Sequence, residues 1–342
     1  MKRFVSAVVA ACILSGCTQP GSEPSEASPN PSPAPTEATS GTPSGSSVAP
    51  VEEPDAVSLP ALFDKDYDGS RLRIGKLVER TPTQRQYDVT YRGDGLTISG
   101  RIAIPEGEGP FPAVVLAHGY IDPDDYVIGQ GMTRERTWFA DHGYVALHVD
   151  YRNYGSSDSE GIPGADLSIG YTTDVINAVL ALRAWDGPVD DDRVALAGRS
   201  LGGGVVLNAL VAVPGLTDAA VVWAPVSSDV SDIYRHFLSG PERADLRAGI
   251  DMIYGSPRDN PEFWRGVSSR TYVDRITEPL LINHGTADET CPIAWSRETV
   301  RALRAAGKDV TLAVYPGEGH DFIDSFEESM KRSGRFVEDQ LR

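Results

Sequence analysis

The chain has 342 residues, 40% of them hydrophobic and 23% charged, which is enough to bury one large core or two small ones. Its 49 acidic residues outnumber the 31 basic ones, and the net charge of −18 would repel phosphate backbones, so we expect no nucleic-acid partner. The three cysteines, Cys12, Cys17 and Cys291, provide no disulfide framework.

Residues 1–16 have the pattern of an export signal. A basic start precedes the apolar run 4–14, which is shorter than the roughly 20 residues that a spanning helix needs. The run ends in the letters LSGC at residues 14–17, which resemble the cleavage site of a bacterial lipoprotein signal. The resemblance implies cleavage before Cys17, a lipid on its sulfur, and export to the outer face of a bacterial cell membrane, with the bilayer as partner through that lipid. An ordinary secretory peptide with an accidental cysteine is the alternative.

Residues 17–58 are rich in Pro, Ser, Thr, Glu and Gly. From residue 18 to residue 58 there is no Lys or Arg and almost no large apolar side chain. Such a composition cannot build a core, so we predict a disordered tether with a span of roughly 35 Å. The globular part of the chain is expected at residues 59–342.

In the globular part, short apolar segments alternate with helical ones at the spacing typical of parallel-sheet units. Segments 86–91 and 96–104 flank the turn Gly93-Asp94-Gly95, which predicts an antiparallel hairpin. Six parallel strands are predicted at 113–117, 145–149, 194–197, 219–223, 279–283 and 311–315. Helices are predicted at 133–142, 171–185, 202–212, 293–306 and 322–337. The expected fold is therefore α/β, with a mostly parallel eight-stranded sheet and helices on both faces.

The segment 227–276 interrupts this alternation because it is too long for an ordinary connection and is rich in aromatic residues. We expect a small helical insertion over the carboxyl edge of the sheet. Doubly wound sheets bind ligands at that edge, so the insertion is a candidate substrate lid. Packing of its aromatic side chains in the core is the alternative.

A glycine-flanked serine follows the predicted strand at 194–197. The letters GRSLG at residues 198–202 lead directly into a predicted helix, which is the nucleophile-elbow pattern with Ser200 at its centre. The five-residue motif is weak by itself, and its place between a strand and a helix makes it informative.

Ser200 needs a base to take its proton and an acid to orient that base. With this elbow the chain order is serine, acid, histidine. His320 lies in a loop after the last predicted strand, and it is our candidate base. Asp288 follows the penultimate predicted strand and is the candidate acid, while Asp229 after the strand before it is the alternative.

The oxyanion that forms on attack needs two backbone amides as donors. We expect one from Leu201, directly after the serine, and one from Tyr120 in the loop after the strand at 113–117. Asp150 and Arg152 follow the next strand, and we expect them to pair beneath the site.

From residue 96 to the C-terminus, about 250 residues, the chain resembles the catalytic domain of prolyl oligopeptidase-like serine hydrolases. The segments that carry the resemblance are the serine elbow with its extra glycines and the letters DYRNYGSS at 150–157, YGSP at 254–257, NPE at 260–262, PLLINHGTAD at 279–288 and YPGEGH at 315–320. The resemblance implies an α/β-hydrolase fold for residues 59–342 and cleavage of an acyl bond through an acyl-serine, without a cofactor.

Peptidases of that family usually carry a large β-propeller before the hydrolase domain, and the length before residue 96 is too short for one. We therefore expect a carboxylic ester hydrolase, with a small exo- or oligopeptidase acting on short peptides and a non-catalytic binding lipoprotein as alternatives. No metal site is predicted, because the histidines are scattered and Cys291 is isolated.

Overall fold

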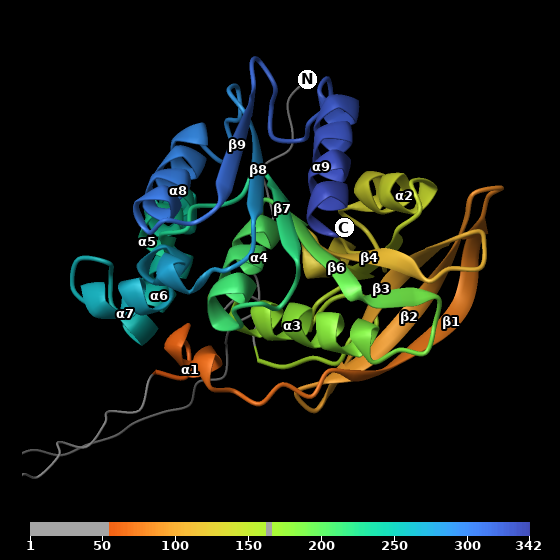
Figure 1. Ribbon diagram of the computed structural model, residues 1–342. Coiled ribbons are helices and arrows are strands. Elements are labelled where there is room, and N and C mark those ends of the chain that lie inside the picture. The colour runs from red at the N-terminus through yellow and green to blue at the C-terminus, as the bar shows by residue number, and fades with distance from the viewer. Residues whose placement is uncertain (1–54, 162–165) are drawn as a thin grey trace, which may run out of the picture. The chain divides into compact units, whose positions relative to one another are not determined.

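The computed structural model of the chain describes residues 55–161 and 166–342 (Figure 1). The predicted signal peptide, Cys17 and the predicted tether up to residue 54 lie outside the described residues. Within these two ranges, no helix has both the length and the apolar character needed to cross a bilayer.

The described residues form one nine-stranded sheet. Its strands are β1 (Ser70–Arg80), β2 (Gln84–Gly93), β3 (Leu96–Pro105), β4 (Phe111–Ala117), β5 (Val145–Val149), β6 (Val189–Arg199), β7 (Ala219–Trp223), β8 (Leu280–Gly285) and β9 (Val310–Tyr315). The order across the sheet is β1-β2-β3-β5-β4-β6-β7-β8-β9. The pairs β1–β2, β2–β3 and β3–β5 are antiparallel, and the remaining neighbours, in the order β5-β4-β6-β7-β8-β9, pair in parallel. The predicted hairpin is β2 and β3, and the sheet is mostly parallel as expected.

The central parallel strands are buried along their whole length. Every residue of β5, β7 and β8 is buried, and these strands are continuous apolar runs apart from a few polar side chains. A strand covered on both faces cannot alternate between apolar and polar residues, which explains why these strands were recognisable as short apolar runs.

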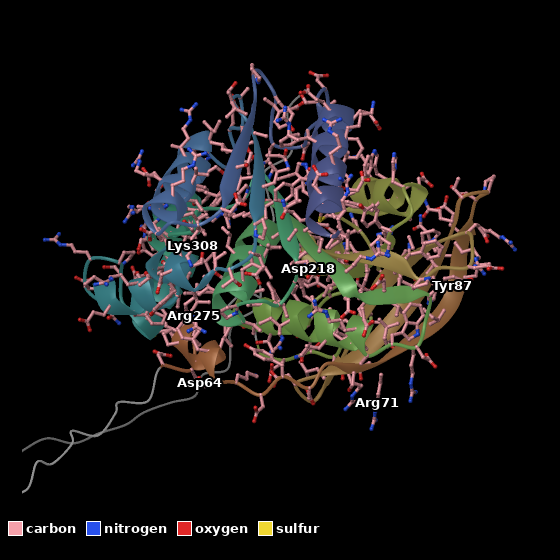
Figure 2. All side chains as sticks on the ribbon, in the orientation of Figure 1. Asp64, Arg71, Tyr87, Asp218, Arg275 and Lys308 are labelled. Atoms are coloured by element: carbon pink, nitrogen blue, oxygen red, sulfur yellow. The ribbon has the colours of Figure 1, made fainter. Side chains whose placement is uncertain are left out.

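The prediction of eight strands was wrong by one, because it missed β1 at the edge of the sheet. Nearly all of β1 is exposed, and only Leu72 is buried. Figure 2 labels Arg71 on this strand, which projects into solvent beside β2. Charged side chains are one way in which edge strands avoid pairing with other chains, and they remove the apolar pattern by which a strand is recognised.

Helices cover both faces of the sheet (Figure 1). Those that flank it are α2 (Thr133–Asp141), α3 (Ile169–Arg183), α4 (Leu201–Ala212), α8 (Ile293–Ala305) and α9 (Phe326–Gln340), and a short helix, α1 (Pro60–Phe63), precedes β1. Val115 of β4 packs in one core cluster with α3, α4 and α8, whereas its neighbour Val114 packs in the other with α2 and α9. Successive residues of one strand thus face opposite helical layers, as a period of two requires.

The segment 227–276 joins β7 to β8 and is helical, as predicted. It contains α5 (Val230–Phe237), α6 (Ala244–Tyr254) and α7 (Pro261–Gly266), with 3-10 turns at Pro241–Arg243 and Ser269–Arg275. Phe263 and Trp264 are buried in a small cluster of their own, so for them core packing is the better description. On α6, by contrast, Met252 and Ile253 are 85% and 66% exposed. Its role as a substrate lid stays a prediction.

Candidate active site

Ser200 sits at a sharp turn between the last residue of β6 and the first residue of α4. Its backbone has φ 56° and ψ −120°, a region that residues with a side chain rarely adopt. The turn is held because the Ser200 amide donates to the carbonyl of Trp223 at 3.0 Å, while the Ser200 carbonyl accepts from the amide of Val226 at 3.1 Å. The hydroxyl is thereby presented at the carboxyl end of β6, as in a nucleophile elbow.

Steric contacts explain why glycine stands at both positions that flank Ser200 in the motif. A Cβ on Gly198 would lie 2.4 Å from the carbonyl oxygen of Gly202. A Cβ on Gly202 would lie 2.0 Å from the carbonyl oxygen of Ala117 at the end of β4. Only glycine allows strand and helix to cross this closely, so the motif is required by the geometry of the turn.

The structure brings His320 and Asp288, the predicted base and acid, into contact. The Nδ1 atom of His320 lies 2.9 Å from Oδ2 of Asp288, and the Asp288 side chain is fully buried while that of His320 is 18% exposed. The alternative acid, Asp229, caps α5 by accepting from the amide of Ser231 at 2.9 Å and makes no contact with His320 among the described residues. The geometry therefore favours Asp288.

Several donors hold Asp288 in its charged form. Its Oδ1 accepts from the amides of Thr290 at 2.9 Å and Cys291 at 2.8 Å. Its Oδ2 also lies 3.2 Å from Nε2 of His284. Burial alone raises the pKa of Asp288, but hydrogen bonds from two histidines and a backbone amide outweigh this and hold that pKa far below its ordinary value. A permanently ionised carboxylate is what a histidine base needs as its orienting partner.

The Ser200 hydroxyl and the His320 imidazole are not joined by a direct hydrogen bond in the part of the chain that the structure describes. Catalytic hydrogen bonds of free enzymes are commonly long and tighten only in the complex with substrate. Since Nδ1 of His320 faces Asp288, the other ring nitrogen, Nε2, is the one available to the serine.

The loop that carries Tyr120 lies against Ser200. A Cβ on Gly119 would approach the Ser200 Cβ to 3.2 Å, so the backbone passes directly beside the serine. Leu201 is the first residue of α4, and its amide is one of the unpaired donors at a helix N-terminus. Tyr120 follows Gly119 and Leu201 follows Ser200, so each residue predicted to supply an oxyanion amide is next in sequence to one of the two residues in contact. The Tyr120 side chain itself is half exposed.

His118, the residue before Gly119, holds the start of this loop through contacts with neighbouring backbone and side-chain groups. Its buried ring places Nδ1 2.6 Å from the carbonyl oxygen of Gly119 and Nε2 3.2 Å from that of Asp150. Its own carbonyl accepts from the Tyr151 hydroxyl at 2.9 Å. Burial first, and the neighbouring His148 second, lower the pKa of His118 to about 4. The neutral ring therefore acts as a structural support at neutral pH.

The predicted pair of Asp150 and Arg152 does not form. The Asp150 carboxylate instead accepts from the hydroxyls of Ser99 and Tyr126, each at 2.6 Å. Arg152 binds Asp174 of α3 at 2.8 Å. The prediction was wrong because the chain turns at the intervening residue, which has φ 66°, and so sends Arg152 toward α3.

Two residues near the triad were not predicted as part of the site. His284 contacts both Asp288 and the hydroxyl of Ser296, the latter at 2.7 Å, and it was not among the predicted site residues. Cys291 is fully buried, and burial followed by the Asp288 charge raises the pKa of its thiol to about 12, while a hydrogen bond with Ser200 lowers it in part. The thiol therefore lies beside the Ser200 hydroxyl in its protonated form. No motif in the sequence signals this proximity.

In the described ranges, one group of three or more His, Cys, Asp or Glu side chains has its ligand atoms all within 4.8 Å of one another, namely Asp190, Asp191 and Asp192. These residues belong to the first half of β6 and are largely exposed, at the opposite end of the strand from Ser200. They are thus no part of the site around Ser200.

A model of the prolyl oligopeptidase family matches residues 131–341. Dipeptidyl aminopeptidase BIII of Pseudoxanthomonas mexicana is 29% identical over 294 residues, which are 78% of this chain and 40% of that protein. The uncharacterised peptidase YtmA of Bacillus subtilis is 27% identical over 246 residues, or 71% of this chain and 89% of its own length. A monoacylglycerol lipase of Mycolicibacterium smegmatis is 27% identical over 251 residues, covering 65% of this chain and 85% of the lipase. The chain thus spans less than half of the dipeptidyl aminopeptidase and most of the two shorter relatives.

Among solved structures, acetyl xylan esterase 1 from Thermoanaerobacterium sp. superposes with a TM-score of 0.63 at 19% identity. The match covers 84% of this chain and 95% of the esterase. Together with the observed strand order, this confirms the α/β-hydrolase fold that the family resemblance implied.

Proposed function

The chain belongs to the prolyl oligopeptidase family, and we propose that it is a serine hydrolase with Ser200 as nucleophile, His320 as base and Asp288 as the acid that orients the base. The observation that carries this proposal is the 2.9 Å contact of His320 with a buried, ionised Asp288, on loops that meet at the strained turn of Ser200. An isolated histidine on the surface would need neither a buried partner nor a nucleophile elbow nearby.

The reaction proceeds in two halves. Nε2 of His320 takes the hydroxyl proton while Oγ of Ser200 bonds to the acyl carbon, and the amides of Leu201 and Tyr120 stabilise the oxyanion. The bond to the leaving group then breaks, and the imidazolium returns its proton to that group. Water repeats the sequence on the acyl-serine, so that the carboxylic acid leaves and Ser200 regains its proton.

We propose a carboxylic ester as substrate. Relatives whose length this chain spans almost fully include a monoacylglycerol lipase at 85%, whereas the dipeptidyl aminopeptidase is spanned only to 40%. Peptide hydrolysis is the second candidate, because the family is named for an oligopeptidase and YtmA, spanned to 89%, is called a peptidase.

Turnover of p-nitrophenyl acetate and of aminoacyl p-nitroanilides by the full chain separates the two candidates. We expect kcat/KM for the ester to exceed that for the anilides by clearly more than the ratio of their uncatalysed hydrolysis rates, because the ester is intrinsically more reactive and only the excess reports transition-state binding. Faster anilide cleavage would make the protein a peptidase.

The serine itself is tested with Ser200→Ala and, as a matched control, Ser70→Ala at the start of β1. The first variant should lose turnover with an unchanged melting temperature, and the second should keep both. Ester turnover that survives in Ser200→Ala would refute the nucleophile. A native protein without turnover on any acyl substrate would point to the non-catalytic binding role.

Export and anchoring are a further proposal, since most of the residues concerned, 1–54, lie outside the described ranges. We propose that cleavage before Cys17 leaves a lipid-modified N-terminus and that residues 17–58 act as a tether at the outer face of a bacterial membrane. Fractionation of cells that express Cys17→Ala tests it. The variant should appear in the soluble fraction, and retention in the membrane fraction would refute the anchor.

A further inference from the structure

Three successive carbonyl groups of the loop that carries His320 each accept a hydrogen bond from an arginine of another element. Arg199 donates through Nη1 to the carbonyl of His320 at 3.3 Å. Arg134 donates through Nη2 to the carbonyl of Asp321 at 2.5 Å and through Nη1 to that of Phe322 at 3.3 Å. The backbone on the C-terminal side of the imidazole is thus fixed from outside the loop.

Arg199 has a second partner that holds its side chain in place. Its Nη2 forms a short ion pair with Glu135, and both side chains are almost fully buried, at 8% and 2% exposure. Glu135 lies in the first turn of α2, directly after Arg134. One end of α2 therefore supplies both the donor for two loop carbonyls and the carboxylate that orients Arg199.

The guanidinium of Arg199 also lies beside an aromatic ring of the same loop. Its central carbon is 5.6 Å from the ring centroid of Phe322, which is fully buried and has φ 51°. Arg134 makes a similar contact at 4.3 Å with Phe326, at the start of α9. The loop is thus anchored at its side chains as well as at its carbonyls.

The other side of the loop is held by Glu318. Its carboxylate accepts from the amides of Gly319 and Ile323, each at 3.0 Å, and from that of Ser325. These bonds lie within the loop and do not connect it to Ser200. Arg199 connects the loop to Ser200, because it precedes Ser200 in the chain and donates to the carbonyl of His320.

We propose that Arg199 and Glu135 are positioning residues that set the distance between the Ser200 hydroxyl and the His320 imidazole. The inference rests on the proposed function, since it assigns a role to these residues through the base and the nucleophile. In this structure the serine and the histidine share no direct hydrogen bond within the described residues, so their approach depends on what holds the two backbones. A misplacement of about 1 Å in such a site costs about 100-fold in rate.

A buried ion pair can also serve only the stability of the fold, so the test needs a control pair of similar burial. The chain contains such a pair. Arg152 and Asp174 are paired at 2.8 Å with side-chain exposures of 8% and 1%, almost the same as those of Arg199 and Glu135. Neither of these two residues touches the loop of His320 in the described chain. Comparison of the two pairs therefore separates positioning from stability.

The test uses two double variants of the full chain, Arg199→Met with Glu135→Gln and Arg152→Met with Asp174→Asn. Removal of both partners avoids an uncompensated buried charge, which is the usual reason for failure to fold. We measure kcat and KM for p-nitrophenyl acetate, the rate of labelling of Ser200 by a fluorophosphonate, and the melting temperature. For the Arg199–Glu135 variant we expect kcat and the labelling rate to fall by about tenfold or more, with KM within about threefold. The Arg152–Asp174 variant should keep kcat within about threefold at a similar melting temperature.

A kcat near that of the native chain in the Arg199–Glu135 variant would overturn the proposal. An equal loss of kcat in both double variants would also overturn it, because the effect would then follow from lost stability. Ser200→Ala is assayed in parallel. If that variant keeps its turnover, the proposed function fails, whereas an inactive Ser200→Ala beside a fully active Arg199–Glu135 variant refutes only the positioning role.

Discussion

Replacement of Gly202 by alanine tests the geometry of the serine turn most severely. The new Cβ would lie 2.0 Å from the carbonyl oxygen of Ala117 and 2.5 Å from that of His118, and ordinary contact begins at 3.4 Å. The first turn of α4 must therefore move away from the end of β4 by about 1.4 Å, the difference between 3.4 and 2.0 Å. Leu201 and Tyr120 lie on opposite sides of this contact, so their amides separate.

Loss of one oxyanion donor costs about 100- to 1000-fold in kcat, and we expect a loss of at least about 100-fold for Gly202→Ala. Overpacking of this kind costs about 1 to 3 kcal/mol of stability, which an α/β domain of this size tolerates. Steady-state hydrolysis of p-nitrophenyl acetate and thermal unfolding monitored by circular dichroism measure the two effects separately.

The control is Gly249→Ala on α6, where an added Cβ meets no atom within 4 Å. Because alanine favours a helix over glycine by about 0.5 to 1 kcal/mol, this variant should melt slightly higher than the native chain. A Gly202→Ala variant that is folded and as active as the native chain would refute the reasoning, since the crossing of strand and helix would then not set the oxyanion site.

Three further predictions concern single groups. Asp288→Asn keeps the size of the side chain but removes the charge that orients His320, so kcat at neutral pH should fall by about 10³- to 10⁴-fold, and a loss below about tenfold would argue against this acid. Because the pKa of His118 is about 4 in the fold against 6.5 ordinarily, the unfolded chain binds a proton that the folded chain does not. Protonation of His118 therefore does not affect the free energy of unfolding above pH 6.5, and it lowers that free energy by about 3 kcal/mol as the pH falls toward 4. Urea unfolding across this range should show a smaller pH dependence in His118→Gln than in the native chain. An equal dependence in both proteins would contradict this prediction. The thiol of Cys291 is buried and has a pKa of about 12, so iodoacetamide at mildly alkaline pH should leave it unmodified in the folded protein and alkylate it in urea, as peptide mass mapping would show; rapid alkylation without urea would be the contrary result.

The sequence predicted those parts of the fold and site that local patterns encode. Steric contacts at the backbone require glycine at 198 and 202, and Ser200 between them adopts a positive φ. The motif by itself therefore predicts the turn. Asp288 and His320 were predicted because each follows a parallel strand, and the carboxyl ends of such strands meet at one edge of the sheet.

The parts that were missed depend on contacts between distant residues. Arg199 was given no role from the sequence, because its partner Glu135 lies 64 residues earlier in the chain. Asp150 and Arg152 were predicted to pair because they are close in sequence, but a single residue of positive φ between them sends their side chains to different partners. Strand β1 was missed because its charged, exposed surface lacks the period of two.

The central claim, that Ser200 is a nucleophile activated by His320, is tested most directly by a fluorophosphonate. The folded full chain is incubated with the probe, and its intact mass and peptide map are recorded. We predict a single adduct on Ser200, no adduct in Ser200→Ala, and labelling slowed by about 100-fold or more in His320→Ala, since the base supplies the activation. A folded native chain that stays unlabelled, or that carries its adduct on another residue, would contradict the account.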